Sequence, residues 1–99
     1  MPLRRLKKLN TQENLWIYIL RLLSEKPKHA YIIRGEIQER FGFKPGTMTA
    51  YKVLYLLNRN GLVKKKQDGR KVVYGITPKG RKMLEEGINF YKDMVDRLI

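Results

Sequence analysis

Lysine and arginine side chains dominate the sequence between Phe41 and Lys82, and the chemistry available to them is the binding of anions. The chain holds 22 Lys and Arg residues against 9 Asp and Glu residues, a formal net charge of +13. A single acid, Asp68, accompanies eleven cations in this stretch, which therefore carries +10 of that charge. Clustered charge of this kind predicts a surface that binds a phosphate polymer, and the alternative is a merely solvated basic face. The cations are Lys44, Lys52, Arg59, Lys64, Lys65, Lys66, Arg70, Lys71, Lys79, Arg81 and Lys82.

The other reactive residue types are too few or too scattered to predict catalysis. With no cysteine and one histidine, His29, we expect no disulfide, no thiolate nucleophile and no metal site. The acids fall mainly on the outer faces of predicted helices, where Glu85 with Glu86 and Glu36 with Glu39 are expected to be solvated. Neither enzymatic activity nor a cofactor is therefore expected.

Apolar segments are too short to cross a membrane. The longest apolar run, Leu15–Leu20, is far below the roughly 18 residues that a span requires. The basic N-terminus lacks the continuous apolar stretch and small-residue cleavage site of a secretory signal. These features predict a cytoplasmic chain with no membrane contact that folds around a single core.

Hydrophobic periodicity predicts one helix on each side of Pro27. The first begins at a capping box formed by Asn10 and Glu13 and runs to about Glu25, before the proline interrupts it. The second closes at Gly42, where a left-handed cap residue is needed. Together with the segment that follows, they predict three helices joined by tight turns.

The third predicted helix runs from Thr47, its cap, to Gly61 and has two different faces. Ala50, Leu54 and Leu57 form the inward face at helical spacing. The opposite face groups cations with apolar and aromatic side chains, which suits a surface that is covered by a partner. This outer face consists of Met48, Thr49, Lys52, Tyr55, Leu56 and Arg59, with Tyr51 on its flank.

A basic β-hairpin is predicted after the third helix. Residues 62–66 and 71–76 are β-rich, and Asp68-Gly69 is a favoured two-residue turn. This turn would place Lys66 opposite Lys71, a like-charge pair that is destabilising unless an anion compensates. The hairpin is therefore a second candidate for phosphate binding.

The two ends of the chain carry amphipathic patterns. Residues 1–9 form a basic arm in which leucine recurs every third position, which is typical of a short amphipathic helix or of a flexible tail. Thr77 caps a last helix that has Pro78 at its first position and continues to the C-terminus. Its heptad spacing predicts a partner helix, although packing on its own domain is the alternative. The seam consists of Leu84, Ile88, Tyr91, Val95 and Leu98.

The order of these elements predicts a mainly α fold with a small β-hairpin, arranged as a winged helix-turn-helix with a C-terminal dimerisation helix. Residues 1–9 would be the arm, 10–80 the DNA-binding domain and 81–99 the dimerisation helix. The third helix would enter the major groove, with Thr47, Met48, Thr49, Tyr51, Lys52 and Tyr55 as candidate contacts. Contacts with the DNA backbone are expected from Lys28, Lys44, Lys64, Lys66, Arg70 and Lys71.

Four motifs stand in an order that resembles the PadR-like transcriptional regulators over roughly residues 15–85. No single motif is specific, and the ordered set carries the resemblance. The motifs are Leu22-Leu23-Ser24-Glu25, Lys28-His29-Ala30-Tyr31, Thr49-x-Tyr51-x-x-Leu54-x-x-Leu57-x-x-x-Gly61-Leu62-Val63 and Tyr74-x-Ile76-Thr77-Pro78-x-Gly80-Arg81.

The resemblance implies a homodimer that acts as a repressor on double-stranded DNA. It also implies that Tyr51 and His29 lie near the DNA, whereas the residues alone predict a cap or surface position for His29. Two features depart from the family pattern: Ala30 stands where glycine is usual, and the single C-terminal helix is short. A small-molecule effector is therefore compatible with the sequence but not indicated by it.

Two other nucleic-acid functions remain open at this point, because attraction to phosphate does not distinguish the acids. An RNA-binding or ribosome-associated winged helix would act as a monomer that prefers structured RNA. A chromatin-type protein would coat DNA with a small ratio of specific to nonspecific affinity. A winged helix that contacts only proteins fits the hairpin charge least well.

Overall fold

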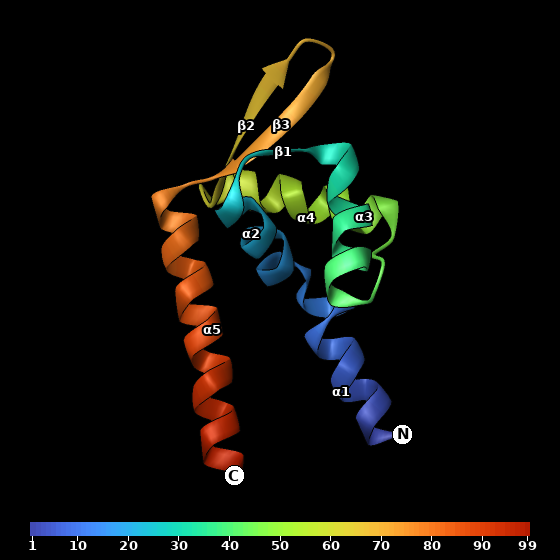
Figure 1. Ribbon diagram of the computed structural model, residues 1–99, viewed down its shortest axis with the longest axis vertical. Helices are drawn as coiled ribbons and strands as arrows, with labels where there is room; N and C mark the ends of the chain where they lie inside the picture. Colours follow the sequence, from blue (N-terminus) through green and yellow to red (C-terminus); the bar gives the residue numbers. More distant parts are fainter.

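The structure, a computed structural model, describes residues 1–99 and is mainly helical with one small sheet (Figure 1). The predicted combination of helices with a β-hairpin is confirmed. Its elements are α1 (Pro2–Asn10), the short 3-10 helix η1 (Gln12–Asn14), α2 (Leu15–Glu25), β1 (Lys28–His29), α3 (Ala30–Phe41), α4 (Thr47–Arg59), β2 (Val63–Asp68), β3 (Lys71–Ile76) and α5 (Pro78–Leu98).

Helix α2 forms the centre of the hydrophobic core. A helix that is apolar nearly all round is stable only when other elements cover it. Helices α3, α4 and α5 and strand β3 all pack against α2. The buried apolar residues of α2 are Leu15, Ile17, Ile19, Leu20, Leu22 and Leu23.

The wing, formed by β2, β3 and their turn, belongs to a three-stranded antiparallel sheet with the order β1-β3-β2. Strand β1, which was not predicted, pairs Lys28 with Tyr74 and His29 with Val73. Two residues give no periodic signal in the sequence, so this strand exists only because β3 offers it a free edge. It connects the wing to the start of α3.

The hairpin turn lies one residue later than predicted. Lys66 is paired with Val73 and Asp68 with Lys71, so Gly69 and Arg70 form the turn. Only glycines have positive φ in the chain, and Gly69 at 64° fits a turn with glycine at its first central position. The expected opposition of Lys66 and Lys71 is therefore wrong, and a pair of opposite charges closes the hairpin instead.

Two helix starts also differ from prediction. Asn10 is the last residue of α1, and its side-chain amide donates to the Leu6 carbonyl at 2.8 Å. Because the arm is itself helical, Asn10 ends a helix and does not cap one, and α2 begins at Leu15. Helix α4 begins at Thr47, with Gly46 in the cap position and no side-chain cap.

The predicted start of α5 is confirmed. The Thr77 hydroxyl accepts a hydrogen bond from the Gly80 N–H at 3.0 Å, and Pro78 is the first helical residue. The same hydroxyl donates to the Gly61 carbonyl at 2.6 Å, and the Thr77 N–H donates to the Leu62 carbonyl at 3.1 Å. These bonds join the start of α5 to the turn that follows α4.

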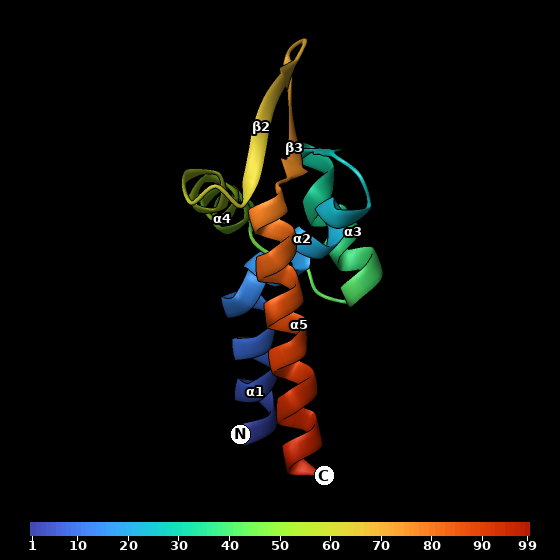
Figure 2. The same ribbon diagram turned by 90° about the vertical axis from the view of Figure 1, so that its left-hand side faces the viewer.

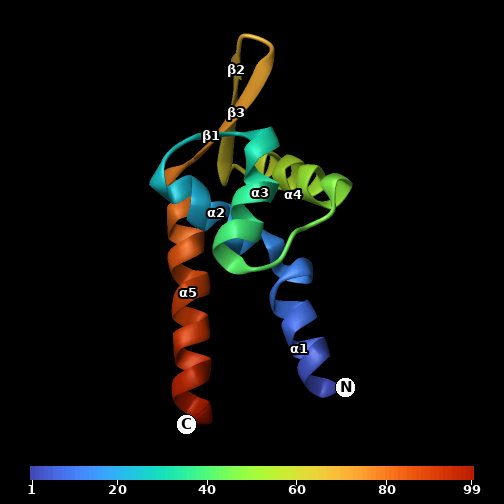
Figure 3. The same cartoon turned by 45° about the vertical axis from the view of Figure 1, so that its right-hand side comes forward.

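The wing and the free ends of α1 and α5 lie at opposite ends of the molecule (Figures 1 and 2). Helices α3 and α4 lie between them, below the wing (Figure 3). None of the helices combines the length and the apolar character that crossing a membrane requires.

We expect Gly80→Ala to lower the free energy of unfolding by about 2 kcal/mol or more, the upper part of the range for overpacking. The added Cβ would lie 2.0 Å from the Leu62 carbonyl oxygen, so the backbone itself must shift. Gly35→Ala in α3 is the matched control, because its Cβ would meet no atom within 4 Å. The control should stabilise by about 0.5–1 kcal/mol. Urea unfolding measures both, and equal effects would contradict the close packing at Gly80.

Candidate nucleic-acid interface

The outer face of α4 is open to solvent along its length. Ala50, Leu54 and Leu57 are buried, as their spacing predicted. Every residue that the sequence proposed for base reading is therefore available, and contact with bases stays a prediction. The exposed side chains are Thr47, Met48, Thr49, Tyr51, Lys52, Tyr55, Leu56 and Arg59.

The loop before α4 is held by a residue that the sequence did not single out. Arg34 of α3 donates from Nε to the Pro45 carbonyl at 2.8 Å, and Pro45 is fully buried. Gly46 provides no side-chain acceptor for the first backbone N–H groups of α4. This end of α4 therefore adds partial positive charge beside Thr47 and Lys44, which suits a phosphate.

The cations of the wing lie on two faces of the hairpin. Lys64 and Lys66 lie on one face of the hairpin. Lys65 lies on the other face, where its cross-strand partner is the buried Tyr74. Lys65 was not among the predicted contacts. The period-two alternation of a strand is the signal that places it on the opposite face from Lys64 and Lys66. The expected backbone contacts that are exposed are Lys44, Lys64, Lys66, Arg70 and Lys71.

A hollow of about 360 Å³ lies between α4, the start of α3 and the wing. Burial raises the pKa of Tyr74, and the proximity of Tyr51 raises it further, so the Tyr74 phenol stays neutral. Cations and aromatic rings together fit a sugar-phosphate backbone that passes beside an inserted helix. The lining residues are Ala30, Tyr31, Tyr51, Lys65, Arg70, Lys71, Val72 and Tyr74.

Side chains of β1 and α3 contact the turn end of the wing. The ammonium group of Lys71 lies 3.4 Å from the Tyr31 hydroxyl and 5.1 Å from the centre of its ring. His29 caps α3, and its Nε2 lies 3.3 Å from the Asp68 carboxylate. The cap or surface position expected for His29 is confirmed, and Tyr31 is a contact that the sequence did not predict.

The structure corrects the prediction for Lys28. Its side chain is only 5 % exposed, and its Nζ lies 2.8 Å from the Glu36 carboxylate. Because β1 pairs with β3, Lys28 is directed into the protein, where it needs a counter-ion. Lys28 is therefore a structural residue and not a free backbone contact.

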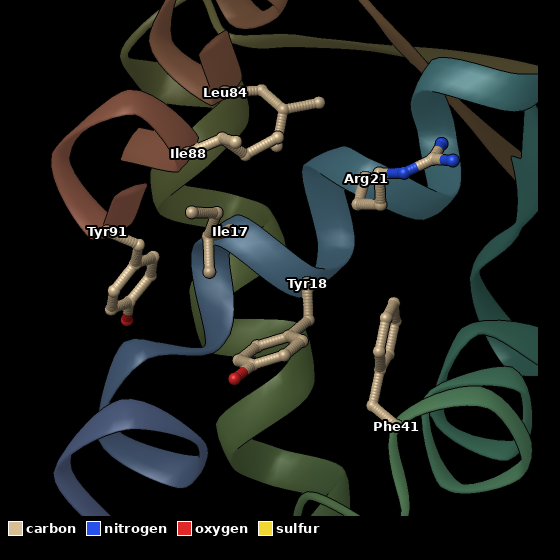
Figure 4. A pocket seen from close by; sticks show the side chains of 7 residues that line it. All are labelled: Ile17, Tyr18, Arg21, Phe41, Leu84, Ile88 and Tyr91. Carbon is tan, nitrogen blue, oxygen red and sulfur yellow. The ribbon is translucent and has the colours of Figure 1, made fainter. Parts of the chain in front are cut away.

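The predicted seam of α5 divides into two parts. Leu84 is buried, and Ile88 and Tyr91 are half-buried against the domain, whereas Val95 and Leu98 are exposed. The first part lines an apolar hollow of about 200 Å³ against α2, with Phe41 beyond the Tyr18 ring (Figure 4). Only the second part of the seam is free to meet another chain.

We expect Lys28→Ala to lower the free energy of unfolding by about 2 kcal/mol, less than the roughly 3–5 kcal/mol of a fully buried pair because Glu36 is partly exposed. Lys64→Ala, the control, should change it by less than about 0.5 kcal/mol. The pair Lys28→Met with Glu36→Leu should regain most of the loss, since it leaves no uncompensated charge. Urea unfolding measures all three, and equal stability of the two alanine variants would contradict this role.

Several solved structures share this fold over most of the chain. A transcriptional regulator from Clostridium thermocellum superposes with a TM-score of 0.79 at 22 % identity, covering 85 % of this chain and 88 % of that chain. F93 from STIV, a winged-helix DNA-binding protein, gives 0.76 at 25 % identity, covering 86 % and 94 %. Bacillus subtilis PadR, in complex with operator DNA, gives 0.65 at 23 % identity, covering 75 % and 46 %. The winged-helix prediction is confirmed.

Sequence comparison identifies the family. No curated protein is significantly similar to the chain in sequence. The model described as the transcriptional regulator PadR-like family matches residues 19–86, which include most of α2, all of α3 and α4, the wing and the start of α5. The match covers more than half of the chain and the same motifs that carried the resemblance. The chain belongs to the PadR-like family of transcriptional regulators.

Proposed function

We propose that this DNA-binding regulator reads duplex DNA as a homodimer, with α4 in the major groove and the wing on the sugar-phosphate backbone, and that it represses transcription. The observation that carries the proposal is the exposed, cation-bearing outer face of α4 beside a basic wing. The PadR relative in complex with operator DNA and the winged-helix DNA-binding relative support it.

Helix α4 has the size and the side chains for major-groove contact. Its 13 residues span about 20 Å at 1.5 Å per residue, and a groove about 12 Å wide admits one helix. Lys52 can donate to guanine O6 and N7, while the methyl groups of Met48 and Thr49 can contact the thymine methyl. Sequence discrimination is assigned to the first half of α4.

The wing and its hollow supply attraction without sequence discrimination. Arg70 and Lys71 at the turn and Lys65 inside the hollow can each neutralise a phosphate. Each neutralised phosphate releases condensed counterions, so binding weakens as salt rises. The contact of Lys71 with Tyr31 holds this charge beside the start of α3.

A homodimer is supported by the second half of α5. Val95 and Leu98 continue the apolar row of Ile88 and Tyr91 beyond the end of the domain and contact nothing that covers them.

Repression by blocking a promoter needs no effector. The apolar hollow of about 200 Å³ is smaller than the roughly 300–1,000 Å³ of most ligand sites.

Lys52→Ala is expected to change which sequences are preferred, because Lys52 faces the bases. Arg70→Ala with Lys71→Ala is expected to weaken all sequences alike and to lower the slope of log affinity against log salt by up to about two. Selection from a random duplex library at several salt concentrations measures both. A uniform loss for Lys52→Ala would make it a phosphate contact, and an unaltered slope would remove the wing from the interface.

The same protein tested against structured RNA separates the other functions. Preference for RNA by a monomer would favour an RNA-binding or ribosome-associated winged helix. A small ratio of selected to random duplex affinity at fixed salt would favour a chromatin-type protein. Either result would overturn the proposed sequence-reading regulator.

We expect Val95→Glu with Leu98→Glu to convert dimers to monomers without unfolding the domain, because both side chains are exposed in the single chain. Ile88 is less suitable, since it also packs on the core. Asn89→Glu is the matched control, as Asn89 is exposed on the opposite side of α5. Analytical ultracentrifugation measures the mass, and circular dichroism checks folding. An unchanged dimer would remove this seam from the interface.

A further inference from the structure

The turn end of the wing carries one acid among many cations. Asp68 is the only acid between Phe41 and Lys82, and the register of the hairpin places it directly opposite Lys71. Residues paired in this way lie on the same face of a hairpin, where their side chains can reach each other. An ion pair between them would occupy the Lys71 ammonium group, which the proposed function assigns to a DNA phosphate.

This ion pair is not formed. The Asp68 carboxylate lies 3.3 Å from His29 Nε2 instead. Lys71 forms no ion pair, and its ammonium group lies against the Tyr31 side chain, 5.1 Å from the centre of the ring. The face of an aromatic ring attracts a cation but carries no net charge, so this contact leaves the charge of Lys71 unneutralised. The acid and the cation are therefore held apart by different partners.

Both partners come from the short segment that joins the sheet to α3 (Figure 1). His29 is fixed in β1 by its pairing with Val73, and Tyr31 lies in the first turn of α3. The two rings lie 5.6 Å apart. The preceding residue, Lys28, is buried and pairs with Glu36 of α3, which anchors the segment. The two rings therefore lie on a fixed support beside the wing.

The Tyr31 contact places the Lys71 ammonium group where a phosphate can reach it. Both residues line the hollow of about 360 Å³ beside α4, and both side chains are exposed to solvent. A lysine ammonium group has three N–H donors, and the hydroxyl of Tyr31, at 3.4 Å, can accept only one of them. The remaining donors are available to a sugar-phosphate backbone in this hollow.

We propose that Tyr31 and His29 are positioning residues that keep Lys71 from pairing with Asp68, so that the Lys71 ammonium group stays free for a DNA phosphate. Tyr31 holds the cation, and His29 holds the acid. The inference rests on the proposed DNA binding and extends it to two residues that need not contact DNA themselves. Because a lysine already paired with an acid releases fewer counterions from DNA, loss of either ring should weaken binding and its salt dependence together.

Substitution of each ring, with and without Asp68→Asn, tests the proposal. Tyr31→Ala and His29→Ala should each weaken duplex binding by about three- to tenfold at fixed salt. Each should also lower the slope of log affinity against log salt by up to about one. In combination with Asp68→Asn, the same substitutions should have little effect, since no acid remains to pair with Lys71. Fluorescence anisotropy with a labelled duplex from the random-library selection measures these affinities.

Three further variants serve as controls. Tyr31→Phe keeps the ring and should retain most of the affinity. Tyr31→Ala should have little further effect in combination with Lys71→Ala, because the cation that it positions is then absent. Asp93→Asn removes the same charge from α5, far from the wing (Figure 1), and should not restore the binding of Tyr31→Ala. Circular dichroism checks the folding of each variant.

Equal losses for Tyr31→Ala with and without Asp68→Asn would overturn the proposal, because Tyr31 would then contact DNA itself or only support the fold. Equal rescue by Asp93→Asn would also overturn it, since net charge alone would explain the effect. Without DNA, the ε-methylene protons of Lys71 should show a ring-current shift that Tyr31→Ala removes, and its absence would contradict the contact. A wild-type chain that binds no duplex would refute the proposed function as well, whereas duplex binding without this coupling would refute the inference alone.

Discussion

The burial of α2 is the constraint on which the rest of the structure depends. The six buried apolar residues of this helix require cover, and α3, α4, β3 and α5 supply it. Each of these elements turns its apolar face toward α2. The surfaces left outward carry cations and aromatic rings on α4, lysines on the wing, and an apolar row near the end of α5. The functional surfaces are what remains once α2 is covered.

Features with a local cause could be predicted from the sequence. The spacing of Ala50, Leu54 and Leu57 fixes which face of α4 is inward, and Gly42 adopts the left-handed cap with φ of 80°. The Thr77 cap depends on residues within one helical turn. The order of such local elements was enough to identify the winged helix and to place α4 and the wing at the candidate interface.

Several wrong predictions concern residues whose environment comes from distant parts of the chain. Strand β1 exists because β3 lies beside it, and that pairing buries Lys28 against Glu36. The error at Asn10 is local: the helix of the arm extends to this residue, so Asn10 ends that helix and does not cap the next one. The Tyr31 contact with Lys71 joins residues 40 positions apart, so only the folded wing reveals it.

The bonds of Thr77 have a geometric consequence for DNA reading. One hydroxyl holds the turn after α4 and the first turn of α5 together, and Gly80 leaves no room for these segments to shift. The start of α5 is therefore tied to the end of α4 at this junction. In the proposed homodimer, the way the α5 helices cross would then set the distance between the two copies of α4. That distance would determine which spacing of half-sites along the duplex the protein can bind.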